Sequence, residues 1–320
     1  MAPKSKTGKS KGKERAEPTT EAVVPFGKQL AHTDKSVRDQ AVRNLTAFLS
    51  AGGDGDEGEG GYTRLEDKEM AKLWKGLFYC FWMSDKPLVQ QALASELADL
   101  LLRINPRTSG DRAAARLDAS LAFLEGFWTA LVREWNGIDR LRIDKYYMLI
   151  RRYVNASFRL AARAGWSSSA VNGTNAILGG EHGPMSWQDK SVPMSLASHL
   201  GDVYLQELDK VLADSDGAAP LVEILRPHIV LVARTRNGTL HRRLIEGVFT
   251  PLLAALKDGD EFENIAAKST VDGEEVDAAG LRAALLRALF EEASQESTIE
   301  SNRRKLYALV RQEEDDEDDE

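Results

Sequence analysis

Residues 63–104 decide the fold of this chain, and they read TRLEDKEMAKLWKGLFYCFWMSDKPLVQQALASELADLLLRI. In the first half, apolar side chains recur every three to four residues, which is the spacing of one face of an α-helix. This face carries Met70, Leu73, Trp74, Leu77, Phe78, Phe81 and Trp82. Thr63 and Glu66 have the spacing of a capping box and predict the start of the helix. A short corner with Pro87 then predicts a second, antiparallel helix over residues 88–104.

The same helical pattern extends in both directions from this pair. Upstream, residues 34–49 place apolar side chains at helical spacing, with Asp34 or Ser36 available as the N-cap. Downstream, three further stretches each present one apolar face, over residues 117–132, 196–212 and 240–256. Pro227 and Pro251 lie inside apolar periodic stretches and should kink or break those helices. Because no alternating strand pattern exceeds four residues, the expected fold class is all-α.

Antiparallel helix pairs joined by short corners predict an irregular α-solenoid. The Asp34-x-x-Val37-Arg38 segment is typical of a HEAT-type helix, although no fixed repeat period runs along the chain. Stretches rich in Gly, Ser and acidic residues predict surface loops within the array. The expected division is a basic disordered arm (1–20), a helical-repeat domain (21–292) with flexible loops near 52–61, 164–193 and 257–276, a short helix (293–312) and an acidic tail (313–320).

Composition bounds the class of protein. With 320 residues, 42% of them hydrophobic and 29% charged, the chain can bury a substantial core. Its longest uncharged apolar run, residues 76–83, is far shorter than the roughly 20 residues of a membrane-spanning helix, so no membrane association is expected. The first residues are polar and basic, so no secretory signal is expected either. The single cysteine, Cys80, excludes an internal disulfide and fits a reducing intracellular compartment.

The net charge of −8 is distributed unevenly, because the two ends of the chain have opposite signs. Residues 313–320 are all acidic. The first 15 residues contain a cluster of five lysines, namely Lys4, Lys6, Lys9, Lys11 and Lys13. Such single-sign blocks commonly serve as interaction arms or as import signals, and they can also simply confer solubility. We therefore interpret the lysine cluster as a candidate nuclear localisation signal.

The residues of common catalytic and metal sites are present without the spacing that those sites need. The histidines are scattered and have no His or Cys partner at ligand spacing, and they are His32, His182, His199, His228 and His241. Ser198 and His199 are adjacent, so on a helix they point about 100° apart. The glycines of residues 52–61 are interleaved with acidic residues that repel phosphate, and they lack EF-hand spacing for calcium. We expect no enzymatic activity, no cofactor, no metal and no small-molecule substrate.

One basic surface stands out in this acidic chain. Residues 133–163 carry eight basic and three acidic side chains. If residues 144–164 form one helix, four cations fall on one side of it, namely Lys145, Arg152, Arg159 and Arg163. The preceding corner adds Arg140 and Arg142, for which a buried Arg–Asp network and a partner contact are both plausible. We interpret these six residues as candidate contacts with RNA or an acidic partner, the alternative being a solvated face with salt bridges.

Two aromatic-rich blocks resemble a known family. They are LWKGLFYCFWMSDKPL over residues 73–88 and EWNGIDRLRIDKYYML over residues 134–149. Both blocks are similar to the nucleolar ribosomal RNA-processing protein 1 family. Shorter matches accompany them at residues 26–31, 37–43, 127–128, 198–208 and 233–236, so the resemblance covers most of residues 26–256. The aromatic side chains of these blocks also fit a helical core, which we favour over a platform for stacking RNA bases.

The resemblance implies a nucleolar, non-catalytic factor of ribosome biogenesis. Members of the family are associated with precursors of the large ribosomal subunit and are needed for rRNA processing. The implied partners are other assembly factors, ribosomal proteins and pre-rRNA, and the implied localisation is the nucleus and nucleolus. The insert at 52–61, the loop at 164–193 and the short acidic end depart from the family, since some relatives have a long basic C-terminal extension. The alternative is a helical-repeat adaptor or regulatory subunit that binds acidic or disordered peptides.

Overall fold

The computed structural model describes residues 29–318 except for residues 31, 53–62 and 260. Within these residues the fold is all-α apart from three very short strands. The first half forms α2 (Lys35–Ala51), α3 (Asp67–Trp82), α4 (Pro87–Arg103), α5 (Arg112–Glu134), the 3-10 turn η2 (Trp135–Gly137), α6 (Ile143–Arg163) and α7 (Ser168–Gly179). The second half forms α8 (Met194–Ala213), α9 (Leu221–Ile224), α10 (Arg226–Arg234), α11 (Gly238–Leu244), the π-helical turn η3 (Ile245–Phe249), α12 (Thr250–Asp258), α13 (Glu263–Ala267), α14 (Ala278–Ser294) and α15 (Glu300–Asp318).

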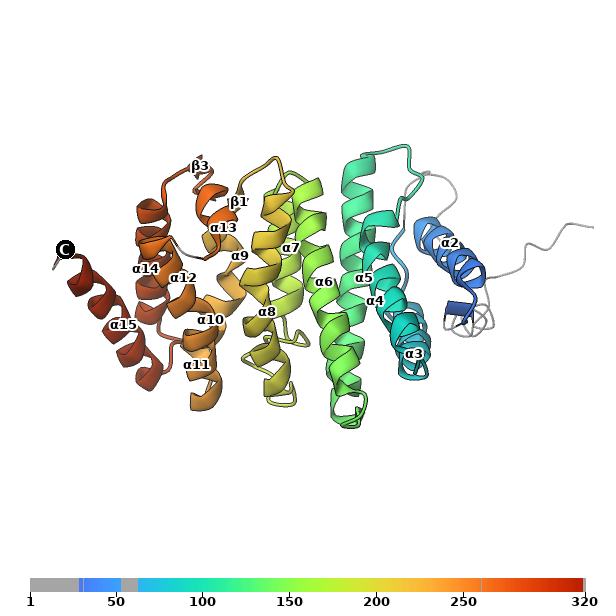
Figure 1. The fold of residues 1–320 in the computed structure, drawn as a ribbon, viewed down its shortest axis with the longest axis horizontal. Coiled ribbons are helices and arrows are strands. Elements are labelled where there is room, and N and C mark those ends of the chain that lie inside the picture. Colours follow the sequence, from blue (N-terminus) through green and yellow to red (C-terminus); the bar gives the residue numbers. More distant parts are fainter. Residues whose placement is uncertain (1–28, 31, 53–62, 260, 319–320) are drawn as a thin grey trace, which may run out of the picture.

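The helices lie side by side in a row that follows the order of the sequence (Figure 1). Helix α6 packs against both α4 and α8, and α5 packs against both α3 and α7. The C-terminal half continues the row through α10, α14 and α15. Each described helix therefore contacts mainly the helices next to it in the row.

The strands close one edge of the C-terminal half. Strand β1 (Ala219–Pro220) pairs in parallel with β2 (Ser269–Val271), and β2 pairs antiparallel with β3 (Glu274–Glu275). The order is therefore β1-β2-β3. This sheet ties the end of α8 to the segment that follows α13.

The aromatic face of α3 lies in the core, as its helical spacing favoured. Trp74 is 2% exposed, and its indole N–H donates to the carbonyl oxygen of Phe123 at 3.1 Å. Phe127 of α5 stacks on Tyr153 of α6 with 3.7 Å between the ring centroids. Gly126 of α5 allows close contact between α5 and α3, because a Cβ atom at this position would lie 2.4 Å from Cδ1 of Trp74. These helices are therefore held together by ring contacts that leave no room for a larger side chain.

The ends of the first helices test the predicted caps. Asp34 is the N-cap of α2, and its carboxylate accepts from the backbone N–H of Ser36 at 2.9 Å. Pro87 occupies the first turn of α4, as expected. The capping box is wrong: α3 begins at Asp67, and its N-cap, Glu66, makes no side-chain capping bond.

The two prolines interrupt helices as predicted. Pro227 lies in the first turn of α10, directly after the short α9. Pro251 lies in the first turn of α12, and the turn before it is the π-helical η3. Because proline lacks an N–H and clashes with the preceding turn, the apolar stretch 240–256 becomes α11, η3 and α12 in place of one regular helix.

Two expected loops contain helices. Residues 164–193 include α7, whose Ala170, Val171 and Leu178 are buried against neighbouring helices. Residues 257–276 include the end of α12, all of α13 and the strands β2 and β3. Gly and Ser content predicted loops there, but tertiary burial of a few apolar side chains stabilises the helices. The expected loop at 52–61 falls almost wholly outside the described residues.

The C-terminal helix is longer than expected and belongs to the packed array. Helix α14 ends at Ser294 and α15 spans Glu300–Asp318, so the acidic block begins inside a helix. Leu306 and Val310 of α15 are buried. Asn302 donates from its side-chain amide to the carbonyl oxygens of Ala233, at 3.2 Å, and Thr235, at 2.8 Å. The packed array therefore extends beyond the boundary expected at residue 292.

Candidate functional site

Helix α6 carries the predicted basic row and lies in the middle of the array (Figure 1). Its apolar face packs between α4 and α8, with Tyr146, Ile150 and Tyr153 fully buried. The opposite face is open to solvent over most of its length, and Arg152, Arg159 and Arg163 are exposed there. The periodicity of the sequence therefore placed three of the four cations on the correct side.

Lys145 is the exception, because it is buried. Its side chain is in the first turns of α6, under the corner between α3 and α4, and the residue is 7% exposed. The ammonium donates to the carbonyl oxygens of Trp82, at 2.6 Å, and Ser84, at 3.0 Å. Burial lowers the pKa of Lys145, and the nearby Asp85 carboxylate partly opposes this effect. Lys145 thus satisfies carbonyls at the end of α3 and cannot be part of a docking surface.

The corner before α6 holds Arg142 in a local network. Its guanidinium pairs with Asp139 and lies 5.1 Å from the centroid of the Trp82 ring. The hydrogen bond from Arg142 lowers the pKa of the Asp139 carboxyl. Arg140 is exposed. The Arg142–Asp139 pair is partly exposed, so it is not the buried Arg–Asp network that the sequence left open, and Arg140 is exposed beside it.

Two of the exposed arginines are tied to α4. Arg159 pairs with Asp99 at 2.8 Å, and Arg163 donates to the carbonyl oxygen of Leu102 at 2.6 Å. Arg152 makes no ion pair or hydrogen bond among the described residues. At 1.5 Å per residue, about 27 Å of helix separates Lys145 from Arg163. The six predicted contact residues therefore do not form a single site.

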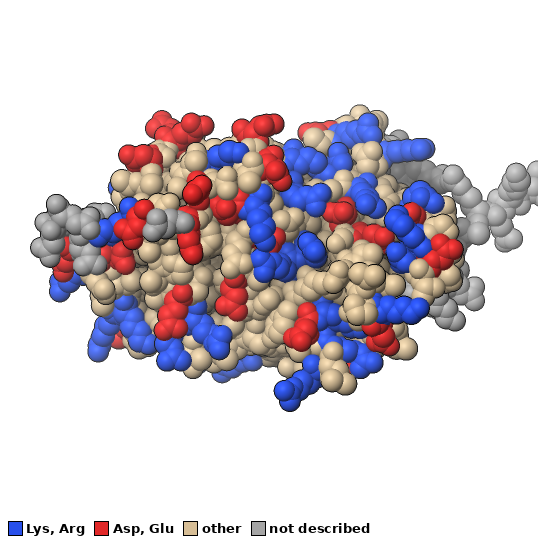
Figure 2. All heavy atoms as spheres, in the orientation of Figure 1, with Lys and Arg blue, Asp and Glu red and all other residues tan. Residues whose placement is uncertain are grey.

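The structure adds two arginines that sequence periodicity did not select. Arg112 and Arg116, from the first turns of α5, line a pocket of about 450 Å3 with Arg163. Among the residues that the structure describes, Asn105 is the other polar residue of the lining, and no carboxylate lines it. Lys and Arg side chains gather over the upper ends of α5 and α6 in Figure 2. The signal was available in the sequence, since residues 103–116 carry four arginines and one aspartate.

The other side of α6 makes an ion-pair network with α8. Arg151 donates to the buried Glu207, which also accepts from Lys210 at 2.8 Å and from the side-chain amide of Asn155 at 3.0 Å. Burial raises the pKa of Glu207, but the hydrogen bonds from Lys210 and Arg151 outweigh it, and the net shift is downward. Arg151 is therefore a structural residue of the contact between α6 and α8.

The described histidines and serines do not assemble into a catalytic group. His228 is fully buried, and burial lowers its pKa to about 3. His199 donates from Nε2 to the carbonyl oxygen of Tyr147, and His241 donates from Nδ1 to the carbonyl oxygen of Val232. Burial raises the pKa of the Cys80 thiol to about 12. In the described part of the chain, no group of three or more His, Cys, Asp or Glu side chains could hold a metal ion.

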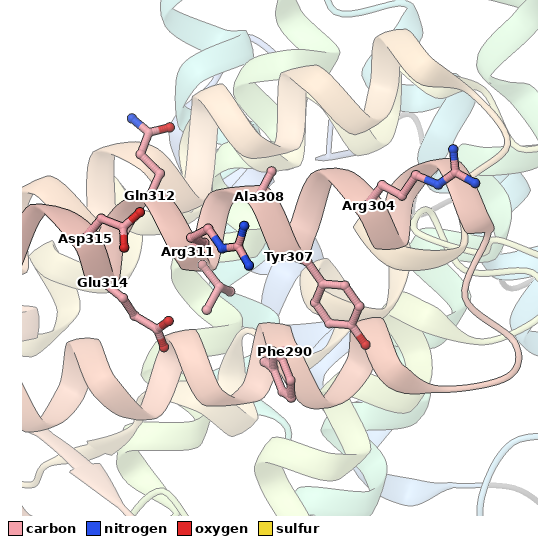
Figure 3. Close-up of a pocket in the computed structure, with 9 residues that line it drawn as sticks. Phe290, Arg304, Tyr307, Ala308, Arg311, Gln312, Glu314 and Asp315 are labelled. Atoms are coloured by element: carbon pink, nitrogen blue, oxygen red, sulfur yellow. The ribbon is translucent and has the colours of Figure 1, made fainter.

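A larger hollow lies at the C-terminal end of the array. It has a volume of about 810 Å3 and is formed between α14 and α15 (Figure 3). Phe290 and Tyr307 face each other there with 5.0 Å between their ring centroids. Its lining includes Arg304 and Arg311 as well as Glu314 and Asp315, so its charge is mixed. Of the helices that the structure describes, none has the length and apolar character needed to cross a membrane.

Comparison with known proteins gives a family match over nearly the whole described array. The model of the family described as "Nucleolar protein, Nop52" matches residues 21–310. The chain is 33% identical over 290 residues to ribosomal RNA processing protein 1 homolog B of Mus musculus, covering 89% of this chain and 38% of that protein. It is 35% identical over 232 residues to the Homo sapiens homolog B, covering 72% of this chain and 28% of that protein.

A third relative is matched over more of its own length. The chain is 28% identical over 337 residues to ribosomal RNA processing protein 1 homolog A of Homo sapiens, covering 90% of this chain and 69% of that protein. The chain therefore spans less than half the length of the two homolog B proteins. The resemblance drawn from the aromatic-rich blocks is confirmed.

Proposed function

The chain belongs to the Nop52 family of nucleolar proteins, and from this membership we propose that it is a non-catalytic assembly factor in nucleolar precursors of the large ribosomal subunit. Its role there is to support the processing of pre-rRNA, as the names of its relatives suggest for those proteins. The expected localisation, the nucleus and nucleolus, agrees with the description of the family. The single observation that carries the proposal is the match over residues 21–310.

The proposed mode of action is that of a scaffold. Helix follows helix in a row, and neighbouring helices pack in two parallel sets, which supports an irregular, HEAT-like α-solenoid. Such arrays offer long surfaces to partners and need no catalytic pocket. The partners that fit are other large-subunit assembly factors, ribosomal proteins and pre-rRNA.

The exposed face of α6 is the proposed contact surface. Arg152 and Arg159 are exposed along it, and Arg140 is exposed in the corner before it. Arg159 pairs with Asp99, whereas Arg152 has no ion-pair partner among the described residues. Cations that are free of carboxylate partners can release counterions when they bind phosphate, which favours nucleic acid over a neutral partner. Lys145 and Arg142 are left out of this surface. Lys145 donates to carbonyl oxygens of the corner between α3 and α4, and Arg142 pairs with Asp139 in the corner before α6.

Depletion of the protein tests the proposed function in cells. We expect loss of the large-subunit rRNAs with the small-subunit rRNA largely intact, because the proposed role belongs to one assembly branch. Northern blotting of precursor and mature rRNA measures this directly. Equal loss of both rRNA classes, or loss of neither, contradicts the proposal.

Affinity purification separates the scaffold from the alternative class of function. Tagged protein should bring down pre-rRNA and large-subunit assembly factors, and the triple reversal R140E/R152E/R159E should reduce both. The matched control R236E/R242E/R243E reverses three exposed arginines on α11 and in the turn before it, away from α6. Recovery of one cargo or catalytic subunit without RNA would instead identify an adaptor or regulatory subunit.

A further inference from the structure

The pocket lined by Arg112, Arg116 and Arg163, here called the arginine pocket, lies where three elements meet. The first two turns of α5 and the end of α6 form two of its sides, and Asn105, which follows α4, also lines it. Leu117 and Leu160 provide apolar walls beside the guanidinium groups. The pocket thus combines three cations with apolar surface.

Two of the guanidinium groups are held close together by one acceptor. The carbonyl oxygen of Leu102 accepts from Arg116 at 2.7 Å and from Arg163 at 2.6 Å. Arg112 donates through Nε to the side-chain oxygen of Asn105 at 3.3 Å. A guanidinium group has five N–H donors, so most donors remain for a ligand. The buried Nε of Arg116 has no hydrogen-bond partner among the described residues.

The positive charge of the arginine pocket is not neutralised from within. No acidic side chain of the described residues lines it. Asp111 is adjacent, but its carboxylate accepts from the backbone N–H groups of Ala113 and Ala114 and caps α5. Partial burial of the guanidinium, followed by repulsion from Arg116, lowers the pKa of Arg163 to about 10, so the group stays protonated at neutral pH. An anion bound between the arginines would offset the repulsion between Arg116 and Arg163.

The chemistry of the pocket selects among anions. Guanidinium groups match the oxygens of phosphate with paired N–H donors, and arginine is favoured wherever such planar recognition matters. A volume of about 450 Å3 exceeds what a bare phosphate fills and leaves room for the adjoining sugar against Leu117 and Leu160. An acidic peptide would bring charge to the pocket but would leave this apolar surface less well filled.

We propose that the arginine pocket binds a phosphodiester group of RNA, with Arg112, Arg116 and Arg163 as the ligand-binding residues. This inference rests on the proposed function, in which pre-rRNA is a partner, and it assigns one point of contact. The pocket shares Arg163 with the open face of α6, but its other walls come from α5 and from the segment after α4.

Fluorescence anisotropy of a labelled single-stranded RNA tests the pocket directly. The triple variant R112Q/R116Q/R163Q should bind about tenfold or more weakly at low salt than the full-length wild-type chain. The slope of log affinity against log salt should fall by about 2, since each lost contact on a single strand is worth about 0.7. The control R236Q/R242Q/R243Q removes the same charge from another surface and should change affinity much less.

A second variant separates loss of RNA binding from loss of folding. It is needed because Arg116 and Arg163 also donate to the carbonyl oxygen of Leu102. R112E reverses an exposed residue without touching that carbonyl, and it should weaken RNA binding several-fold more than R242E does. A circular dichroism melt of each variant confirms that the array remains folded.

The outcomes separate this inference from the proposed function. If pocket and control variants lose affinity equally, or if R112E binds RNA as the wild type does, the pocket assignment is wrong. If a polyglutamate peptide binds at the pocket and the RNA does not, the ligand is an acidic protein and the assignment is also wrong. In each case the wild-type protein can still sediment with large-subunit precursors, which is the readout of the proposed function alone.

Discussion

Lys145 and Arg163 fall on the same side of α6 by sequence periodicity, yet their environments differ. Lys145 is buried and donates to Trp82 and Ser84, whereas Arg163 is exposed beside the arginine pocket. The difference comes from the neighbours of each end of α6, because the corner after α3 covers the first turn and leaves the last turn open. The role of a charged residue on this helix is therefore decided by the element packed beside it.

Replacing Lys145 should weaken the fold. Lys145→Met keeps most of the side-chain volume but leaves the carbonyl of Trp82 without its donor, so the free energy of unfolding should fall by about 1–3 kcal/mol. Arg152→Met is the matched control, and at this exposed site it should change stability by less than about 0.5 kcal/mol. Urea denaturation measures both, and equal effects would mean that Lys145 is a surface residue after all.

Gly126 should tolerate no side chain. A Cβ atom would lie 2.4 Å from Cδ1 of Trp74 in a packed core, so Gly126→Ala should cost about 1–3 kcal/mol of unfolding free energy. Gly137→Ala is the control, because a Cβ atom at that position would meet no other atom within 4 Å and the change should be nearly neutral. Thermal unfolding of the two variants checks the prediction, and a neutral Gly126→Ala would show that α3 and α5 pack less tightly than their ring contacts indicate.

His228 should make the fold sensitive to mild acid. Its pKa is lowered to about 3 by burial, whereas an unfolded chain binds the proton near the ordinary value of 6.5. Below pH 6.5, His228 takes up a proton in the unfolded state but stays neutral in the folded state. The free energy of unfolding therefore falls as pH falls from 6.5 toward 3. His228→Phe should remove this loss, which amounts to about 2 kcal/mol between pH 7 and pH 5. Denaturation curves at both pH values measure it, and identical pH dependence in wild type and variant would exclude the effect.

At the scale of elements, the C-terminal half departs most from simple helical periodicity. Prolines divide one apolar stretch into α11, η3 and α12, and the packing of α15 brings a partly acidic segment into the array. Arg282 of α14 is 1% exposed and pairs with Glu313 of α15 at 2.9 Å. Helix α15 therefore completes the core at this end and covers a buried charge.

Removing α15 should destabilise the whole C-terminal half. Deletion of residues 300–320 exposes the surface that Leu306 and Val310 cover and removes Glu313 from Arg282, and it should cost at least about 3 kcal/mol. Deletion of residues 314–320 keeps all three residues and should leave the thermal midpoint almost unchanged. Calorimetry of both truncations checks this prediction, and equal midpoints would show that α15 contributes nothing to folding.

At the scale of the whole molecule, basic and acidic side chains gather over different parts of the array. Basic side chains gather over the upper ends of α5 and α6, while acidic side chains dominate the top of the C-terminal half in the same view (Figure 2). The chain carries a net charge of −8, so a local basic surface can direct an anionic partner to one place. The lysine cluster at the N-terminus lies outside the described residues and is a separate basic feature.

The lysine cluster should govern nucleolar accumulation. Replacing Lys4, Lys6, Lys9, Lys11 and Lys13 by serine should disperse a fluorescently tagged protein, because import signals are read through dense positive charge. Replacing the same five residues by arginine keeps the charge and should preserve the nucleolar signal. Microscopy of the two variants decides the point, and unchanged localisation of the serine variant would make the cluster dispensable.

The sequence by itself determined the all-α class, the first antiparallel helix pair, the interruptions at Pro227 and Pro251 and the family, because periodicity, proline and aromatic-rich blocks act over neighbouring residues. It could not determine that residues 168–179 are helical, since burial against other helices stabilises a segment of poor intrinsic propensity.

Only the tertiary structure placed Arg112 and Arg116 beside Arg163, which is about fifty residues away in the chain. It also buried Lys145 and left Arg152 exposed on the same helix. The physical reason is that helical periodicity fixes the direction of a side chain from its own helix, whereas the charge and dielectric environment of that side chain depend on elements distant in sequence.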